Sequence, residues 1–107
     1  MTHTVVVTER AAADLAEATA WWACERSAEQ ALRWYSKIRK AIDTLEEHPQ
    51  RCGIAAESPD FPYKLRELHF GLHSRPTHRV LFTIAGTTVV VLTVRHVAQR
   101  AVKPEDV

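Results

Sequence analysis

Two amphipathic helical segments in immediate succession constrain the fold of this chain more than any other feature. In the first, Thr8 can cap a helix, and its apolar stripe is Ala11, Leu15, Ala18 and Trp22. In the second, Ser27 and Gln30 have the spacing of a capping box, and the stripe is Ala31, Tyr35, Ile38, Ile42 and Leu45. We expect Pro49 to end this second helix. Helices joined by so short a turn should lie antiparallel, as a hairpin.

Short β-branched and aliphatic runs flank the hairpin on both sides. Thr4–Val7 precedes it and is suited to a strand. After a loop over 51–62, three more strands are expected at Tyr63–Phe70, Thr77–Ile84 and Thr88–Val94. The last is almost wholly apolar, which predicts a central strand buried on both faces. The order predicts an α+β fold: an N-terminal short strand, an antiparallel two-helix hairpin and a three-stranded antiparallel meander.

The length and composition indicate one small globular domain. With 107 residues, the chain has room for a single core, and we expect one domain over 1–107, with its core at about 3–100 and a tail at 101–107. The longest apolar runs are too short to span a bilayer, and the first residues lack a secretion signal. Cys24 and Cys52 alone imply no disulfide framework. A cytoplasmic protein without a membrane partner is therefore expected.

Charge is distributed unevenly along the chain. The formal net charge is +1, but residues 63–100 carry six Lys or Arg against Glu67 alone, together with four of the six histidines. A basic half of this kind suits a polyanion or an acidic protein partner. On charge alone, a solvated face without a specific partner explains it equally well.

The basic strands can form one cluster of chemical interest. Alternation along the strands predicts that Arg79 and Arg95 share a face with Lys64 or Arg66, where they can hold a phosphate. His78 or His96 at the margin can move a proton near neutral pH. Such a set suffices for metal-free RNA cleavage, in which the 2′-hydroxyl attacks phosphorus, arginines stabilise the phosphorane and an acid protonates the leaving oxygen.

The alternative for these residues is purely structural. A mid-strand arginine can simply pair with Glu67 or a helix carboxylate, and a histidine at a strand end is often only a surface residue. Neither a cofactor nor a metal is expected, because no glycine-rich phosphate loop is present and the cysteines lie far apart. Three histidines near one hairpin turn have no carboxylate or thiol to complete a metal site: His69, His73 and His78.

The ordered set of short motifs resembles the RelE/ParE toxin superfamily, which includes plasmid stabilisation proteins. The helix start carries Thr8, Ala11, Asp14 and Leu15, and the second helix closes with Leu45 and Pro49. The strand motifs that continue the resemblance are Leu65-Arg66-Glu67-Leu68, His78-Arg79-Val80-Leu81-Phe82 and Val91-Leu92-Thr93-Val94-Arg95-His96. The resemblance runs from about His3 to Arg100, and the predicted order of elements agrees with it.

The resemblance implies the toxin of a type II toxin–antitoxin module, a growth inhibitor neutralised by a cognate antitoxin. RelE-like members cut mRNA on the ribosome without a metal, whereas ParE-like members poison DNA gyrase and are not nucleases. Arg79 matches a position that is catalytic in RelE-like enzymes, and His96 matches an end-of-sheet position commonly occupied by His, Lys or Arg. The candidate catalytic residues are thus Arg79, Arg95 and His96, and the candidate substrate-binding residues are Lys64, Arg66, His78 and Arg100.

Departures from the nuclease pattern leave the target open. Residues 97–107 lack the aromatic residue common near the C-terminus of RelE-like enzymes, and Gln99 stands where the family often has an arginine. Three hypotheses follow: a ParE-like inhibitor of gyrase, slightly favoured by the long helices; a ribosome-dependent mRNA endonuclease; and an inactive member that only binds antitoxin. Whether the protein is an enzyme is thus left open.

The antitoxin is expected to be an acidic, amphipathic segment that folds as it binds. Trp21, Trp22 and Trp34 cannot all share one helical stripe, since Trp21 is rotated by about 100° from Trp22. An exposed Trp21 or Trp34 can serve as a partner-binding anchor. The alternative, packing between the helices, is expected for at least one of them.

Overall fold

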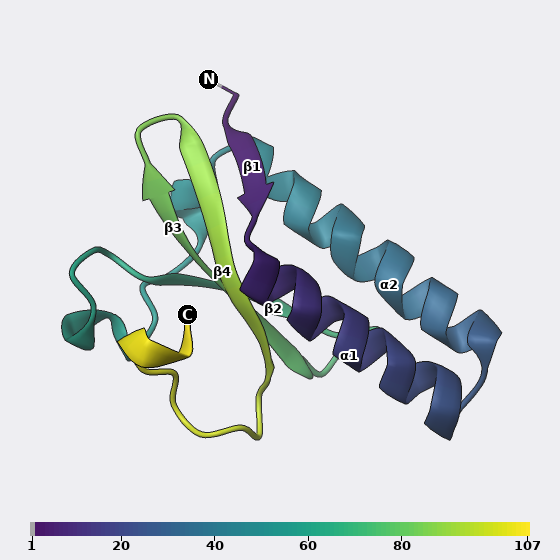
Figure 1. Cartoon of the computed structure of the whole chain (residues 1–107). Coiled ribbons are helices and arrows are strands. Elements are labelled where there is room, and N and C mark those ends of the chain that lie inside the picture. Colours follow the sequence, from purple (N-terminus) through teal and green to yellow (C-terminus); the bar gives the residue numbers. More distant parts are fainter. Residues whose placement is uncertain (1) are drawn as a thin grey trace.

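The computed structural model describes residues 2–107 and places a helical hairpin on one face of a four-stranded sheet (Figure 1). The helices are α1 (Glu9–Glu25) and α2 (Ala28–Asp43). The strands are β1 (Thr4–Val7), β2 (Arg66–Phe70), β3 (His78–Ala85) and β4 (Thr88–His96). This confirms the predicted α+β class and element order.

The sheet has the order β1-β4-β3-β2. Strands β2, β3 and β4 form the expected antiparallel meander, and β1 joins as a parallel edge strand beside β4. The sheet is therefore mixed, and β4 is central, as its apolar sequence predicts. Gly86, with a φ of 62°, makes the turn between β3 and β4, a conformation that glycine adopts without strain.

Both predicted helix caps are present. The Thr8 hydroxyl accepts a hydrogen bond from the Ala11 amide at 3.2 Å, and the Ser27 hydroxyl accepts one from Gln30 at 3.1 Å. Thr8 also donates to the Leu92 carbonyl at 3.2 Å. Leu92 is the extra residue of a β-bulge, between the pairs Leu81–Thr93 and Phe82–Val91. The start of α1 is therefore tied to the irregular point of the central strand.

The second helix differs from its prediction in two ways. Tyr35 is 40% exposed, whereas Trp34 is fully buried and takes its place in the apolar stripe. This occurs because Trp34 lies three residues after Ala31 and four before Ile38, a spacing as helical as that of Tyr35. Pro49 does not end α2, which closes at Asp43 and passes into a 3₁₀ turn at Thr44–Glu46.

Two apolar clusters lie on opposite faces of the sheet. The larger lies under the helices and includes Trp34, Ile38, Val80 and Phe82. The smaller is Ala55, Phe61, Leu65, Leu81 and Val102, so the loop after α2 and the C-terminal tail cover the other face (Figure 1). Neither α1 nor α2, within residues 2–107, is long and apolar enough to cross a membrane.

Candidate functional site

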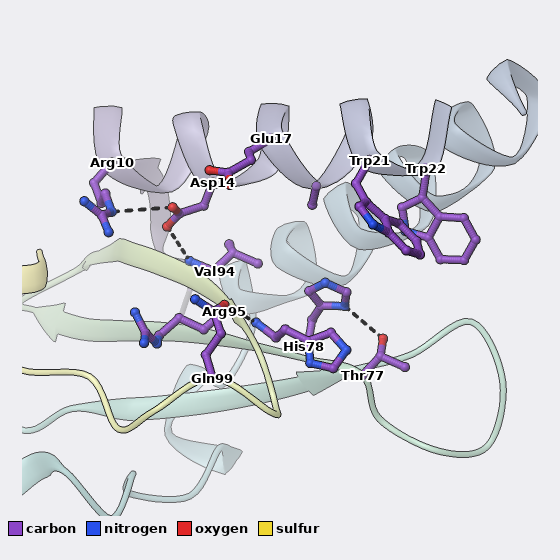
Figure 2. Close-up of a pocket in the computed structure, with 12 residues that line it drawn as sticks. Arg10, Asp14, Glu17, Trp21, Trp22, Thr77, His78, Val94, Arg95 and Gln99 are labelled. Atoms are coloured by element: carbon purple, nitrogen blue, oxygen red, sulfur yellow. Dashed lines mark hydrogen bonds and ion pairs between the residues drawn. The ribbon is translucent and has the colours of Figure 1, made fainter. Parts of the chain in front are cut away.

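A groove of about 700 Å³ opens between α1 and one end of the sheet (Figure 2). Its helical wall and its sheet wall come from segments far apart in sequence. The helical wall consists of Arg10, Asp14, Glu17, Ala18, Trp21 and Trp22. The sheet wall consists of Thr77, His78, Val94, Arg95, His96 and Gln99. The groove thus gathers several of the predicted site residues beside the aromatic end of α1.

Asp14 fixes α1 to the sheet at one end of this groove. Its carboxylate accepts hydrogen bonds from the Thr93 hydroxyl and, at 3.0 Å, from the Val94 amide. Arg10 pairs with the same carboxylate, with 3.4 Å between Nε and Oδ1. Asp14 therefore has a structural role, and it holds the helical wall at a defined distance from β4.

The two histidines form the floor of the groove. The His78 ring lies between Trp34 and His96, with centroid separations of 5.0 and 5.2 Å. Its Nδ1 is 2.8 Å from the Thr77 hydroxyl. Burial, and then the adjacent His96, lower the pKa of His78 to about 4. The His78 ring is consequently neutral at pH 7.

His96 is oriented by the turn that follows β4. The Ala98 amide donates to its Nδ1 at 3.0 Å, and the His96 amide donates to the Gln99 side-chain oxygen at 2.8 Å. Because Nδ1 accepts a hydrogen bond, the neutral His96 ring carries its proton on Nε2. Gln99 thus supports the turn that places this histidine at the edge of the groove.

Arg79 lies on the other face of the sheet, away from His78. Its Nη2 donates to both Glu57 carboxylate oxygens at 2.8 Å, and its Nε donates to Glu67 at 3.2 Å. Only 16% of the Arg79 side chain is exposed. The structural alternative for this residue, a pairing with Glu67, is therefore present, and Glu57 adds a second carboxylate.

Glu57 is the buried centre of that cluster. It also accepts a hydrogen bond from the Val102 amide at 3.1 Å. Burial alone would raise the pKa of the Glu57 carboxyl, but the hydrogen bonds from Arg79 and Val102 outweigh it and hold the pKa below its ordinary value. Glu57 is thus charged at pH 7 and joins Arg79 to the C-terminal tail.

Arg95 and Arg100 are also engaged by the tail. Arg95 is the register partner of Arg79, and its Nη2 donates to the Arg100 carbonyl at 2.8 Å. Its buried Nε has no hydrogen-bond partner within residues 2–107. Arg100 is exposed and pairs with both Asp106 oxygens, at 2.9 and 3.0 Å. The shared face of Arg79 and Arg95 is confirmed.

The expected clustering of Arg66 with these arginines is wrong. Arg66 is the register partner of Phe82, so it lies on the helix-facing side of the sheet. There it donates to the Cys52 carbonyl at 2.8 Å and lines a separate hollow with Lys64. Successive residues of a strand point to opposite faces, so Glu67, next to Arg66, points to the face of Arg79. There its carboxylate accepts the hydrogen bond from Arg79 Nε.

The two candidate tryptophan anchors have different environments. Trp21 is 53% exposed and contacts Trp22 edge to face, with centroids 5.5 Å apart. Trp34 is fully buried against Phe70 and His78, so its expected role as an exposed anchor is wrong. Trp34 thus packs between α2 and the sheet, within the larger apolar cluster.

Sequence reasoning missed two acidic residues, one in the Arg79 cluster and one in the groove. Glu57, the buried partner of Arg79, lies in a loop whose position depends on long-range packing. Glu17 had a detectable signal, since it shares a helical face with Trp21 at a spacing of four. Within residues 2–107, no group of three His, Cys, Asp or Glu side chains is placed to hold a metal ion.

Comparison with known protein families gives one match that covers most of the chain. The family model described as the ParE toxin of the type II toxin–antitoxin system parDE matches residues 5–101. No curated protein sequence matches the chain.

Solved structures with similar folds include chains from two toxin–antitoxin systems. A chain of the chromosomal ParDE system from P. aeruginosa has 22% sequence identity and a TM-score of 0.71, covering 90% of this chain and 97% of its own. A chain of the RelBE2 complex from Mycobacterium tuberculosis has 23% identity and a TM-score of 0.55, with coverages of 90% and 99%. Both likenesses concern the fold.

Proposed function

Because the chain belongs to the ParE toxin family, and so is a type II toxin of the RelE/ParE superfamily, we propose that it inhibits DNA gyrase without cutting RNA. A cognate antitoxin neutralises it, and both act in the cytoplasm, where gyrase works on the chromosome. The family match is to the ParE branch, the branch for which the sequence resemblance implies gyrase as target.

The engagement of Arg79 is the observation that carries the non-catalytic proposal. To stabilise a phosphorane, its guanidinium would have to exchange two carboxylates for phosphate oxygens. One of these carboxylates, Glu57, is buried and would be left charged without its partner. Breaking such a buried pair costs about 3–5 kcal/mol, which would be added to the activation barrier.

The separation of the arginines and histidines supports the same proposal. Arg79 lies on the sheet face covered by the tail, whereas His78 lies on the face covered by the helices. A general acid or base must come within hydrogen-bonding reach of the atoms whose charge the arginine stabilises. One bound phosphodiester cannot contact both Arg79 and His78 through the intervening sheet.

An antitoxin partner for this chain is supported by its family and by its neighbours. The similar solved structures are described as toxin–antitoxin systems or complexes. The groove beside α1 and the exposed Trp21 provide a surface that such a partner can cover.

Two reactions run in parallel test the proposal. Purified protein is titrated into a gyrase supercoiling assay, and separately into a reconstituted translation reaction in which mRNA 5′ ends are mapped by primer extension. We expect loss of supercoiling with intact mRNA. New cleavage sites within the reading frame that disappear in Arg79→Ala would overturn the proposal in favour of the endonuclease. No effect in either reaction would instead favour an inactive member that only binds antitoxin.

A further inference from the structure

We propose that the groove beside α1 receives an arginine side chain from the antitoxin, held between the Trp21 ring and the Glu17 carboxylate. This inference rests on the proposed antitoxin partner and specifies where, and through which chemistry, that partner is recognised. It adds a basic anchor to the acidic, amphipathic segment that the sequence led us to expect.

The first argument is the placement of an acid and an aromatic ring on one helical face. Glu17 and Trp21 are separated by four residues, so their side chains are neighbours along α1, and both line the groove (Figure 2). Ala18 lies between them on the same wall and leaves space that a larger side chain would fill. In Figure 2 the Glu17 side chain points along α1 towards Asp14, so a group that contacts both its carboxylate and the Trp21 ring must span the wall formed by Ala18.

Of the two carboxylates that line the groove, Glu17 is the one without an ion-pair partner in the described part of the chain. Asp14 is occupied by Arg10, Thr93 and Val94, whereas Glu17 has no ion-pair partner among residues 2–107. An exposed carboxylate beside an exposed indole favours a cation, because the face of the ring is also electronegative.

The cations near Glu17 are engaged with other partners or are neutral. Arg10 is paired with Asp14, and Arg95 directs its Nη2 to the Arg100 carbonyl. The His78 ring, with its pKa of about 4, remains neutral. The two arginines of the groove, Arg10 and Arg95, thus leave the Glu17 carboxylate unpaired.

Arginine fits this chemistry better than lysine. Its planar guanidinium can stack on an indole and at the same time donate two parallel hydrogen bonds to one carboxylate. The volume of about 700 Å³ exceeds that of one side chain, so apolar neighbours of the arginine can pack against Ala18 and Trp22. The unpaired Glu17 carboxylate would repel an acidic or phosphate anchor at this position.

Nuclear magnetic resonance of the full chain provides the test, with the tryptophan indole N–H signals as reporters. N-acetyl-arginine amide is the probe, N-acetyl-citrulline amide is its uncharged analogue of the same shape, and N-acetyl-lysine amide tests the choice of cation. We expect a saturable shift of the Trp21 signal by the arginine probe. The citrulline probe should bind at least fivefold more weakly.

Two variants of α1 make the test specific. Glu17→Gln should weaken binding of the arginine probe at least fivefold, whereas Glu25→Gln, on the same helix but outside the groove, should leave it unchanged. Equal binding of citrulline, an equal or stronger response to lysine, or indifference to Glu17→Gln would overturn the proposal. Concentration-dependent Trp21 shifts without any probe would also overturn it and indicate a second copy of the chain as the occupant.

This experiment is independent of the toxin's target. Arginine binding at Glu17 without inhibition of gyrase would leave the groove assignment intact and reject the proposed target. Inhibition of gyrase without arginine binding would support the proposed target and reject the arginine site in the groove.

Discussion

Arg79 illustrates how the partners of a side chain decide what that side chain can do. The sequence resemblance aligns it with a catalytic position of RelE-like enzymes, yet Glu57 and Glu67 occupy its guanidinium. The residue therefore acts as a bridge between β3, the loop after α2 and the tail.

Removal of this bridge should destabilise the protein. Arg79→Met leaves Glu57 buried without its cation, so we expect the free energy of unfolding to fall by about 3 kcal/mol in urea denaturation. Adding Glu57→Gln removes the uncompensated charge, and the double variant should recover most of the loss. If Arg79→Met is as stable as wild type, the ion pair is not formed in solution.

His78 should make the fold sensitive to acid. In the unfolded chain its ring takes up a proton near pH 6.5, whereas in the folded chain it does so only near pH 4. Between these values the unfolded state binds more protons, so stability is full above about pH 6.5 and is lost as the pH falls towards 4.

A variant isolates this contribution from that of the carboxylates. After allowance for solvent access, we expect wild type to lose about 2 kcal/mol more than His78→Asn between pH 7 and pH 4. The exposed His73→Asn serves as the control and should follow wild type. Identical pH profiles for wild type and His78→Asn would show that His78 is not buried as described.

At the level of elements, local chemistry predicted the helix starts and strand positions well. Thr8 and Ser27 are caps because their hydroxyls reach amides three residues on, which sequence spacing alone reveals. The end of α2 was not predictable from Pro49, because the helix closes six residues earlier, where the Thr44 amide and hydroxyl donate to carbonyls of its last turn.

Properties that depend on strand register or on packing could not be predicted from the sequence. Lys64 lies before β2 begins, and alternation within the strand does not say which residue of the next strand is paired with Arg66. Only the pairing of Arg66 with Phe82 settles that Glu67 meets Arg79. Likewise Trp34 and Tyr35 fit the same stripe in sequence, and only the packing against Phe70 and His78 separates them.

The cap of α1 offers a prediction at this scale. Thr8→Ala removes both the bond from Ala11 and the bond to the Leu92 carbonyl, so we expect a loss of about 1 kcal/mol in unfolding free energy. Thr8→Ser keeps the hydroxyl and should lose only a few tenths. Equal stability of the serine and alanine variants would mean that the hydroxyl contributes nothing to either contact.

Over the whole molecule, the sheet separates Arg79 from His78, whereas Arg95 shares the face of Arg79 and also borders the groove. Helices α1 and α2 cover one face of the sheet, and the loop after α2 and the tail cover the other (Figure 1). His78 and the groove lie on the first face, and Arg79 lies on the second. A nuclease needs these groups to converge on one phosphate, whereas an inhibitor that acts by binding can use separate surfaces. The placement of Arg79 and His78 on opposite faces of the sheet thus supports the proposal that this toxin acts by binding and does not cut RNA.

The most direct measurement of that proposal is the supercoiling of relaxed plasmid by purified gyrase, with increasing amounts of this protein and the heat-unfolded protein as control. If the toxin inhibits gyrase, we expect a dose-dependent loss of supercoiling with the folded protein only, while mRNA in a translation reaction remains uncut. Undiminished supercoiling at excess toxin, together with cleaved mRNA, would contradict it.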